Sequence, residues 1–329
     1  MKTRIWILIG MLMGVIVSCS EDSISPSTDP ETFDGLYSLP QGNHDYDARI
    51  VELSNKYNTR IYYKFVDKDY YWGVSTDIRW RFDTVNNRIV AGDDALPADE
   101  NYVGEQLDLL ENHFLKYFSD TLLLRTMPYR VLLSSVFDYI IYSSTGMPEV
   151  LPRTLVNAYS GYDYLAFNWG NANVKTMTSE QINAFKNDAV CVFLQRLADK
   201  ELIKRSTAFT SVTNYGASMT AANMYEFGIL HYSYRTIAGD WEQYVKAIVS
   251  TPYEQLIAPG GILHPDIDKK QMIRKKYDLA GLLVWLRGMA ALRRVARAGT
   301  VVRGFVARVK SGVNGLRKQT RGARPLIHT

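Results

Sequence analysis

The chain has 329 residues, of which 47% are hydrophobic and 12% aromatic, a content that can bury a core and excludes a disordered, collagen-like or low-complexity protein. Two cysteines exclude a disulfide framework, and five scattered histidines leave little material for a metal site. The net charge of +4 is unevenly distributed: residues 279–329 contain eleven Lys or Arg and no acidic residue, which leaves 27 basic and 34 acidic side chains in residues 1–278.

The first residues have the charge order of an export signal. Lys2 and Arg4 precede an apolar run, residues 5–17, that is too short to span a bilayer as a mature helix. The run ends in Ser18 and Cys19, which resembles the lipobox of bacterial lipoproteins, where the cysteine is lipidated and becomes the mature N-terminus. We expect residues 1–18 to be a lipoprotein signal peptide and Cys19 to carry lipid, palmitate included. A plain signal peptide with an incidental cysteine is the alternative.

Residues 19–33 are polar and contain two prolines, so they cannot bury enough apolar surface to fold and we expect a tether. Glu21 and Asp22, directly behind the cysteine, resemble the surface-export signal of lipoproteins in Bacteroidetes-type bacteria. The predicted location is therefore the outer membrane, with the protein facing outward from the cell surface.

The first half of residues 34–278 predicts helices mixed with short strands. Apolar residues recur at helical spacing over 45–58 and again over 103–118, and residues 60–65 alternate as in a half-buried strand. Short apolar runs at 131–133 and 164–167 are further strand candidates.

The clearest helix start lies at Thr178, which forms a predicted capping box with Gln181. The core face of this helix is predicted to hold Ile182, Phe185, Ala189, Phe193 and Leu197, which places Asn187, Asp188 and Cys191 on its flanks. Two later helices are expected to begin at Asp240 and near Asp266.

These elements in this order, with the lipobox, the tether and the segment 273–279 (IRKKYDL), resemble the zinc-binding metallopeptidase lipoproteins of Bacteroidetes. Members of that family are often found among glycan-uptake systems. The resemblance covers about residues 33–279. It implies an α+β fold for residues 34–278, with a zincin-like body, a small mixed sheet and several helices.

In that family the central helix carries His-Glu-x-x-His, which supplies two zinc ligands and a general base. Here Asn187 and Cys191 stand where the histidines belong, and Asp188 stands where the glutamate belongs. The third family ligand corresponds to Asp240 or Glu242. The predicted protein is therefore a pseudoenzyme without a cofactor, and Cys191 is expected to be a small buried residue rather than a nucleophile.

The alternative is a rebuilt zinc site that uses His231, Asp240 and His264, which are separated in the sequence. It would keep the protein an active metallopeptidase.

Aromatic residues gather in two polar stretches, and flat rings beside polar groups suit sugars. The candidate ligand-binding residues are Tyr70, Tyr71, Trp72, Tyr162 and Trp169. The alternative is a tyrosine-rich core, and solvent exposure distinguishes the two.

Residues 279–329 form a basic tail that lacks both acidic residues and tyrosine. It can form a basic amphipathic helix that attracts anionic lipid or nucleic acid, or it can be the aberrant product of a shifted reading frame, which the composition favours. Members of the family continue with an aromatic-rich, acidic closing segment instead.

Together these observations predict a surface-anchored, non-catalytic lipoprotein that binds peptide or glycan beside a nutrient-uptake system, with no nucleic-acid partner. The alternatives are an active zinc metallopeptidase with a non-standard metal site and a structural subunit of an outer-membrane uptake complex.

Overall fold

A computed structural model describes residues 36–71 and 78–287, with side chains as far as Gly281. The chain divides into two units, residues 1–38 and residues 39–329, and every described helix and strand belongs to the second. The predicted signal peptide, Cys19, the tether, Trp72 and most of the basic tail lie outside the described residues.

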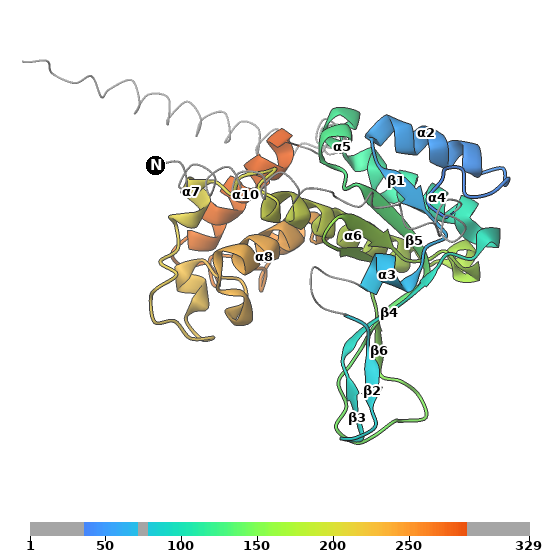
Figure 1. Cartoon of the computed structure of the whole chain (residues 1–329). Coiled ribbons are helices and arrows are strands. Elements are labelled where there is room, and N and C mark those ends of the chain that lie inside the picture. Colours follow the sequence, from blue (N-terminus) through green and yellow to red (C-terminus); the bar gives the residue numbers. More distant parts are fainter. Residues whose placement is uncertain (1–35, 72–77, 288–329) are drawn as a thin grey trace, which may run out of the picture. The chain divides into compact units, whose positions relative to one another are not determined.

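The fold is α+β, as the sequence predicted, and its central element is a six-stranded mixed sheet (Figure 1). The strands of this sheet are β1 (Arg60–Tyr62), β4 (Gly92–Pro97), β5 (Arg130–Ile140), β6 (Arg153–Leu155), β7 (Ala158–Ser160) and β8 (Tyr164–Phe167). The first half of β5 pairs in parallel with β1 and β8, and its second half pairs antiparallel with β4 and β6. A separate hairpin, β2 (Arg81–Asp83) and β3 (Arg88–Val90), lies at the end of β5 that is away from α2 and α5 (Figure 1).

Strand β5 is longer than the apolar run 131–133 indicated. Val131, Leu132 and Leu133 are fully buried between two parallel neighbours, where strands are apolar on both faces. Beyond them the strand continues through Ser134, Ser135 and Asp138. Because these residues are polar, an apolar run did not predict this half of the strand. The polar half of β5 is the part that borders the candidate site described below.

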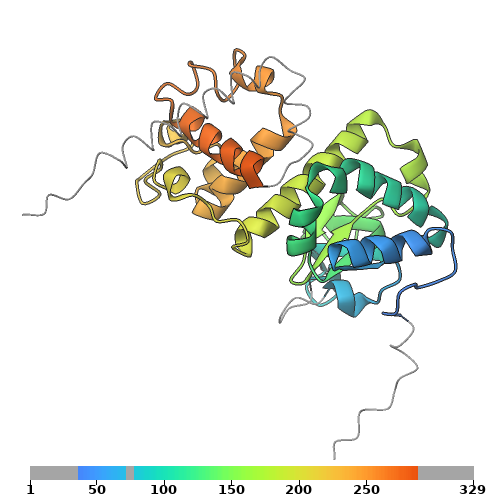
Figure 2. The same cartoon turned by 90° about the horizontal axis from the view of Figure 1, so that it is seen from above.

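Helices α2 (Asp47–Tyr57), α4 (Val103–His113) and α5 (Asp120–Thr126) precede or follow the first strands and bury their apolar stripes in the main core. The helix predicted over 103–118 ends at His113 and is followed by the 3₁₀ helix η3 (Leu115–Tyr117), although every stripe residue is buried: Val103, Leu107, Leu110, Phe114 and Phe118. Figure 2 shows α2 beside α5. The strand predicted over 60–65 ends at Tyr62, and α3 (Asp67–Tyr71) follows.

Helix α6 (Ser179–Asp199) confirms the predicted capping box, because the Thr178 hydroxyl accepts from Gln181 N–H while Gln181 Oε1 accepts from Thr178 N–H. Its core face is nearly as predicted: Phe185, Ala189, Phe193 and Leu197 are buried, and only Ile182 is partly exposed. The start of this 21-residue helix was predicted correctly because it combines a capping box with apolar residues at helical spacing.

The last part of the described chain is helical: α7 (Thr207–Thr210), α8 (Ile237–Ser250), α9 (Tyr253–Ile257) and α10 (Met272–Arg287), with 3₁₀ helices η5 (Met224–Phe227) and η6 (Tyr232–Tyr234) between α7 and α8. Figure 2 shows α8 and α10 side by side.

Both helix starts predicted in this part were wrong. Helix α8 begins three residues before Asp240, because Thr236 caps it with its hydroxyl. Helix α10 begins at Met272 rather than near Asp266, because the Asp268 carboxylate accepts hydrogen bonds from the N–H groups of Ile273 and Arg274.

The predicted boundary at residue 279 falls inside α10, where Ala280 is fully buried. Within the described residues, no helix combines the length and apolar character needed to cross a bilayer.

Candidate functional site

A cavity of about 650 Å³ opens beside the polar half of β5. Its walls come from β5, from the end of β6, from the segment that follows β8, from η4 (Ala172–Thr176) and from the first turn of α6. The lining residues are Ser135, Val136, Phe137, Asp138, Leu155, Asn168, Trp169, Asn171, Asn173, Thr176, Thr178 and Gln181. The volume lies within the range of roughly 300–1,000 Å³ that small-molecule sites occupy.

One wall of the cavity is a rigid corner that follows β8. The buried Asn168 amide donates to the carbonyls of Phe137 (2.9 Å) and Val156 (3.0 Å), and its Oδ1 accepts from Trp169 N–H at 2.7 Å. Trp169 adopts a left-handed backbone conformation, with φ of +80°, which L-residues other than glycine rarely adopt. Its indole donates to Asn157 Oδ1 at 2.8 Å. These bonds compensate for the backbone strain and fix the corner.

Other parts of the lining are held by side-chain amides and hydroxyls. Asn171 donates from Nδ2 to the Ser135 carbonyl and accepts from Asn173 N–H at 2.9 Å through Oδ1. Thr178 and Gln181 contribute the capping box of α6. Local hydrogen bonding therefore places a row of neutral polar groups around the opening.

The lining of the cavity carries no uncompensated charge. Among the described lining residues the single ionisable one is Asp138, whose Oδ2 lies 2.8 Å from Arg153 Nη1. The other described lining residues are neutral.

The α6 positions predicted to align with a zinc motif, Asn187, Asp188 and Cys191, do not fit a metal ion. Asp188 accepts a hydrogen bond from Asn157 Nδ2 at 2.7 Å, and Asn187 presents a carboxamide that is a poor zinc ligand. Burial raises the pKa of the Cys191 thiol to about 12, and the nearby Asp188 carboxylate acts in the same direction. Because zinc binding and nucleophilic attack both need the thiolate, Cys191 suits neither role at neutral pH.

The alternative zinc site is also wrong. Asp240 is fully buried, paired with Lys276, and accepts from the Tyr215 hydroxyl at 2.6 Å. His231 caps η6 by accepting from Ser233 N–H, and His264 accepts from Asp266 N–H. Across residues 36–71 and 78–287, no three His, Cys, Asp or Glu side chains gather as metal ligands. In the tertiary structure Asp240 is paired with the Lys276 ammonium and not placed beside either histidine as a metal ligand.

Most of the predicted aromatic binding surface belongs to the core. Tyr70 and Tyr71 are 0% and 4% exposed, and Tyr70 packs against Phe137 with ring centroids 5.2 Å apart. The prediction was wrong for these residues because their polar sequence neighbours suggested a loop, whereas α3 turns both rings inward. Tyr162 is 65% exposed but lies apart from the lining of the cavity, and Trp169 is buried with part of its surface in the cavity wall.

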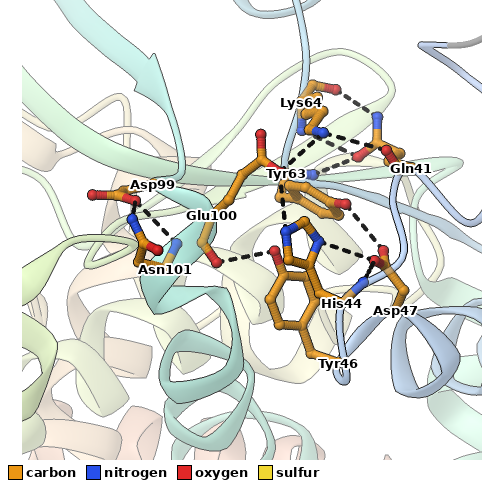
Figure 3. Close-up of polar contacts among 9 residues, drawn as sticks. All are labelled: Gln41, His44, Tyr46, Asp47, Tyr63, Lys64, Asp99, Glu100 and Asn101. Atoms are coloured by element: carbon orange, nitrogen blue, oxygen red, sulfur yellow. Dashed lines mark hydrogen bonds and ion pairs between the residues drawn. The ribbon is translucent and has the colours of Figure 1, made fainter.

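A second polar cluster, which was not predicted from the sequence, surrounds His44, three residues before the start of α2 (Figure 3). The His44 ring stacks on Tyr46 with centroids 4.8 Å apart, and its Nδ1 and Nε2 lie 3.2 Å from Asp47 and 3.4 Å from Glu100. The buried Asp47 carboxylate also accepts from Tyr63 at 3.0 Å.

Gln41 and Lys64 extend the cluster around His44 through backbone and side-chain hydrogen bonds (Figure 3). The only hydroxyls drawn in it are the phenols of Tyr46 and Tyr63. Burial raises the pKa of Tyr46 to about 12 and raises that of Tyr63 as well. Neither phenol is an activated nucleophile. The hydrogen bonds and ion pairs of the cluster connect residues 41–47 to Tyr63 and Lys64, directly after β1, and to η2 (Glu100–Tyr102).

Comparisons with known proteins give no relative from which a site could be transferred. A scan against models of protein families gives no match, and searches of curated proteins and of solved structures give none either. The assignment of function therefore rests on the cavity and on the sequence signals.

Proposed function

We propose that this protein is a non-catalytic, ligand-binding lipoprotein of the outer membrane, which faces outward and holds peptide or glycan beside a nutrient-uptake system. The observation that carries the proposal is the cavity beside β5, whose walls combine neutral hydrogen-bonding groups with apolar side chains and contain no unpaired charge. Such a lining suits binding and orientation rather than proton transfer or metal-assisted hydrolysis.

The chemistry of α6 supports a binding role. In a metallopeptidase with a zincin-like body this helix would supply two nitrogen ligands and a general base, and here it supplies a carboxamide, a hydrogen-bonded aspartate and a protonated thiol at those positions. The order of helix, strand, mixed sheet and capped helix supports the proposed zincin-like body.

The proposed binding role predicts that the full-length chain, purified in detergent, binds at least one probe from a panel of defined oligosaccharides and short peptides and returns it intact by mass spectrometry. Ser135→Phe is expected to abolish this binding because the larger side chain fills the cavity. Thr154→Phe on the exposed face of β6 serves as control and retains binding. Zinc-dependent cleavage of a peptide, or no binding of any probe, would overturn the proposal.

The proposed anchor predicts that Cys19 carries the lipid. In a bacterial host with a lipoprotein pathway, radioactive palmitate is expected to label the wild-type protein and to leave Cys19→Ala unlabelled, whereas Cys191→Ala is labelled as the wild type is. Cell fractionation shows which membrane contains the protein, and protease treatment of intact cells shows whether the protein is exposed on the cell surface. Labelling of the Cys19→Ala variant would contradict the assignment.

A further inference from the structure

We infer that the ligand of the cavity is a neutral glycan rather than a peptide strand or a charged molecule; this inference rests on the proposed function. Three properties of the cavity support this inference: its described lining has no uncompensated charge, the β5 carbonyls beside it already accept hydrogen bonds, and several neutral side-chain groups remain for a ligand.

The first property, the lack of uncompensated charge in the described lining, argues against an ionic ligand. Moving a carboxylate, sulfate or ammonium group out of water is unfavourable unless the site supplies an opposite charge or several hydrogen bonds. In the part of the chain that the structure describes, the lining contains no Lys, Arg or His, and its one carboxylate, Asp138, already has the Arg153 guanidinium at 2.8 Å. An acidic oligosaccharide or a charged peptide side chain would therefore lose hydration without gaining an ion pair from the lining.

The backbone of β5 argues against a peptide. An extended peptide usually binds by adding a strand to an open sheet edge, where main-chain groups await partners. Here the carbonyls of Ser134, Ser135 and Phe137 already accept from Gly170 N–H, Asn171 Nδ2 and Asn168 Nδ2, respectively. On its other side this part of β5 pairs with β4. Side chains and backbone of the same chain thus already bind the carbonyls that an added peptide strand would use.

The remaining groups match sugar hydroxyls. Hydrogen bonds within the described residues use Gln181 Oε1 but leave Gln181 Nε2, the Ser135 hydroxyl and the Asn173 amide for a ligand. Amides and hydroxyls together offer donors and acceptors at neutral charge, as the hydroxyls of a sugar do. Val136, Leu155 and Trp169 supply apolar surface in the same lining for the C–H faces of a sugar ring.

Gln181→Glu tests this inference with little cost to folding. Glutamate at this helix position retains an oxygen for the Thr178 N–H and is as good a capping-box residue as glutamine. It replaces the Nε2 donor by an oxygen and places a negative charge at the opening. Asn183→Asp is the matched control, since it adds the same charge to an exposed position two residues further along α6, outside the lining.

The probes for calorimetry on the full-length chain are maltohexaose, cellohexaose, xylohexaose, a hexagalacturonate and an uncharged Ser/Ala/Val hexapeptide. We expect a neutral oligosaccharide to bind, with affinity at least tenfold lower in Gln181→Glu and Ser135→Ala and within twofold of the wild type in Asn183→Asp. Circular dichroism verifies folding of each variant.

Three results would overturn the inference. Binding of the hexapeptide or the hexagalacturonate that Gln181→Glu weakens, with no neutral oligosaccharide bound, would reject the glycan and leave the proposed function in place. If Gln181→Glu and Ser135→Ala both bind a neutral oligosaccharide as tightly as the wild type does, the glycan binds at another surface and not in this cavity. Failure of every probe would reject the proposed function itself.

Discussion

Lys276→Met is expected to lower the free energy of unfolding by about 3–5 kcal/mol, since it leaves the buried Asp240 carboxylate without its cation. Both side chains are fully buried. The Lys276 ammonium also donates to Thr213 Oγ1 at 2.9 Å and to the Gly228 carbonyl at 3.1 Å, and lies 4.7 Å from the centre of the Phe209 ring. Urea unfolding followed by circular dichroism measures the loss.

Burial dominates the electrostatics of this pair. It raises the pKa of Asp240 and lowers the pKa of Lys276, while the attraction between the two groups opposes both changes. The pair is therefore costly to desolvate, and each member depends on the other to remain charged. Removing both charges in Lys276→Met/Asp240→Leu is expected to recover at least half of the stability that Lys276→Met loses.

An exposed pair provides the control for Lys276→Met. Lys270 Nζ lies 2.7 Å from Glu226 Oε2, but the two side chains are 59% and 52% exposed. Lys270→Met removes the same charge by the same substitution and is expected to change stability by no more than about 0.5 kcal/mol, because solvent screens the interaction. A loss below about 1 kcal/mol in Lys276→Met, or equal losses in the two variants, would contradict the importance of the buried pair.

Asp93→Asn is expected to stabilise the protein by about 3 kcal/mol at pH 8 and to have little effect at pH 4. Burial raises the pKa of Asp93 to about 6 from an ordinary value of 3.8, and the hydrogen bond from Tyr70 only partly opposes this change. Below pH 3.8 the side chain is protonated in both the folded and the unfolded chain, so it contributes no pH dependence there.

Between pH 3.8 and about 6 the unfolded chain releases the Asp93 proton while the folded chain retains it, so the wild type loses stability as pH rises. Above pH 6 the loss is complete, and asparagine avoids it. Chemical denaturation at pH 4, 6 and 8 measures the effect. Asp94→Asn is the control, because Asp94 lies 3.6 Å from Arg153 and loses an attractive contact instead. A gain for Asp93→Asn that is the same at pH 4 and pH 8 would contradict the assigned titration.

Helices with both a cap and a continuous apolar stripe were predictable from the sequence. Thr178 and Gln181 fixed the start of α6, and the stripes of α2 and α4 are buried as expected. The starts of α8 and α10 were not predictable in the same way. The N–H group that the Thr236 hydroxyl caps belongs to a glycine, Gly239, rather than to a Glu or Gln of a capping box. Asp268 caps α10 from a turn that lies four residues before the helix begins.

The candidate site was less accessible to sequence reasoning than the fold. Its lining is contributed by five separate segments, and most of its residues are Asn, Ser, Thr or Gln, which also occur in ordinary loops. A possible signal was the density of Asn between residues 157 and 173, which includes Asn157, Asn168, Asn171 and Asn173. Asparagine favours loops and turns in general, so this density did not distinguish a cavity from a surface loop.

The sequence by itself determined the α+β class, and it predicts an export signal ending at Cys19 and a helix at 179–199 without His-Glu-x-x-His, because each depends on residues close together in the chain. Only the tertiary structure decided that Tyr70 and Tyr71 are core, that Asp240 pairs with Lys276, and that Asn168 and Asn171 donate to carbonyls of β5. Burial and pairing between distant residues depend on how the elements pack, and local spacing carries no record of that packing.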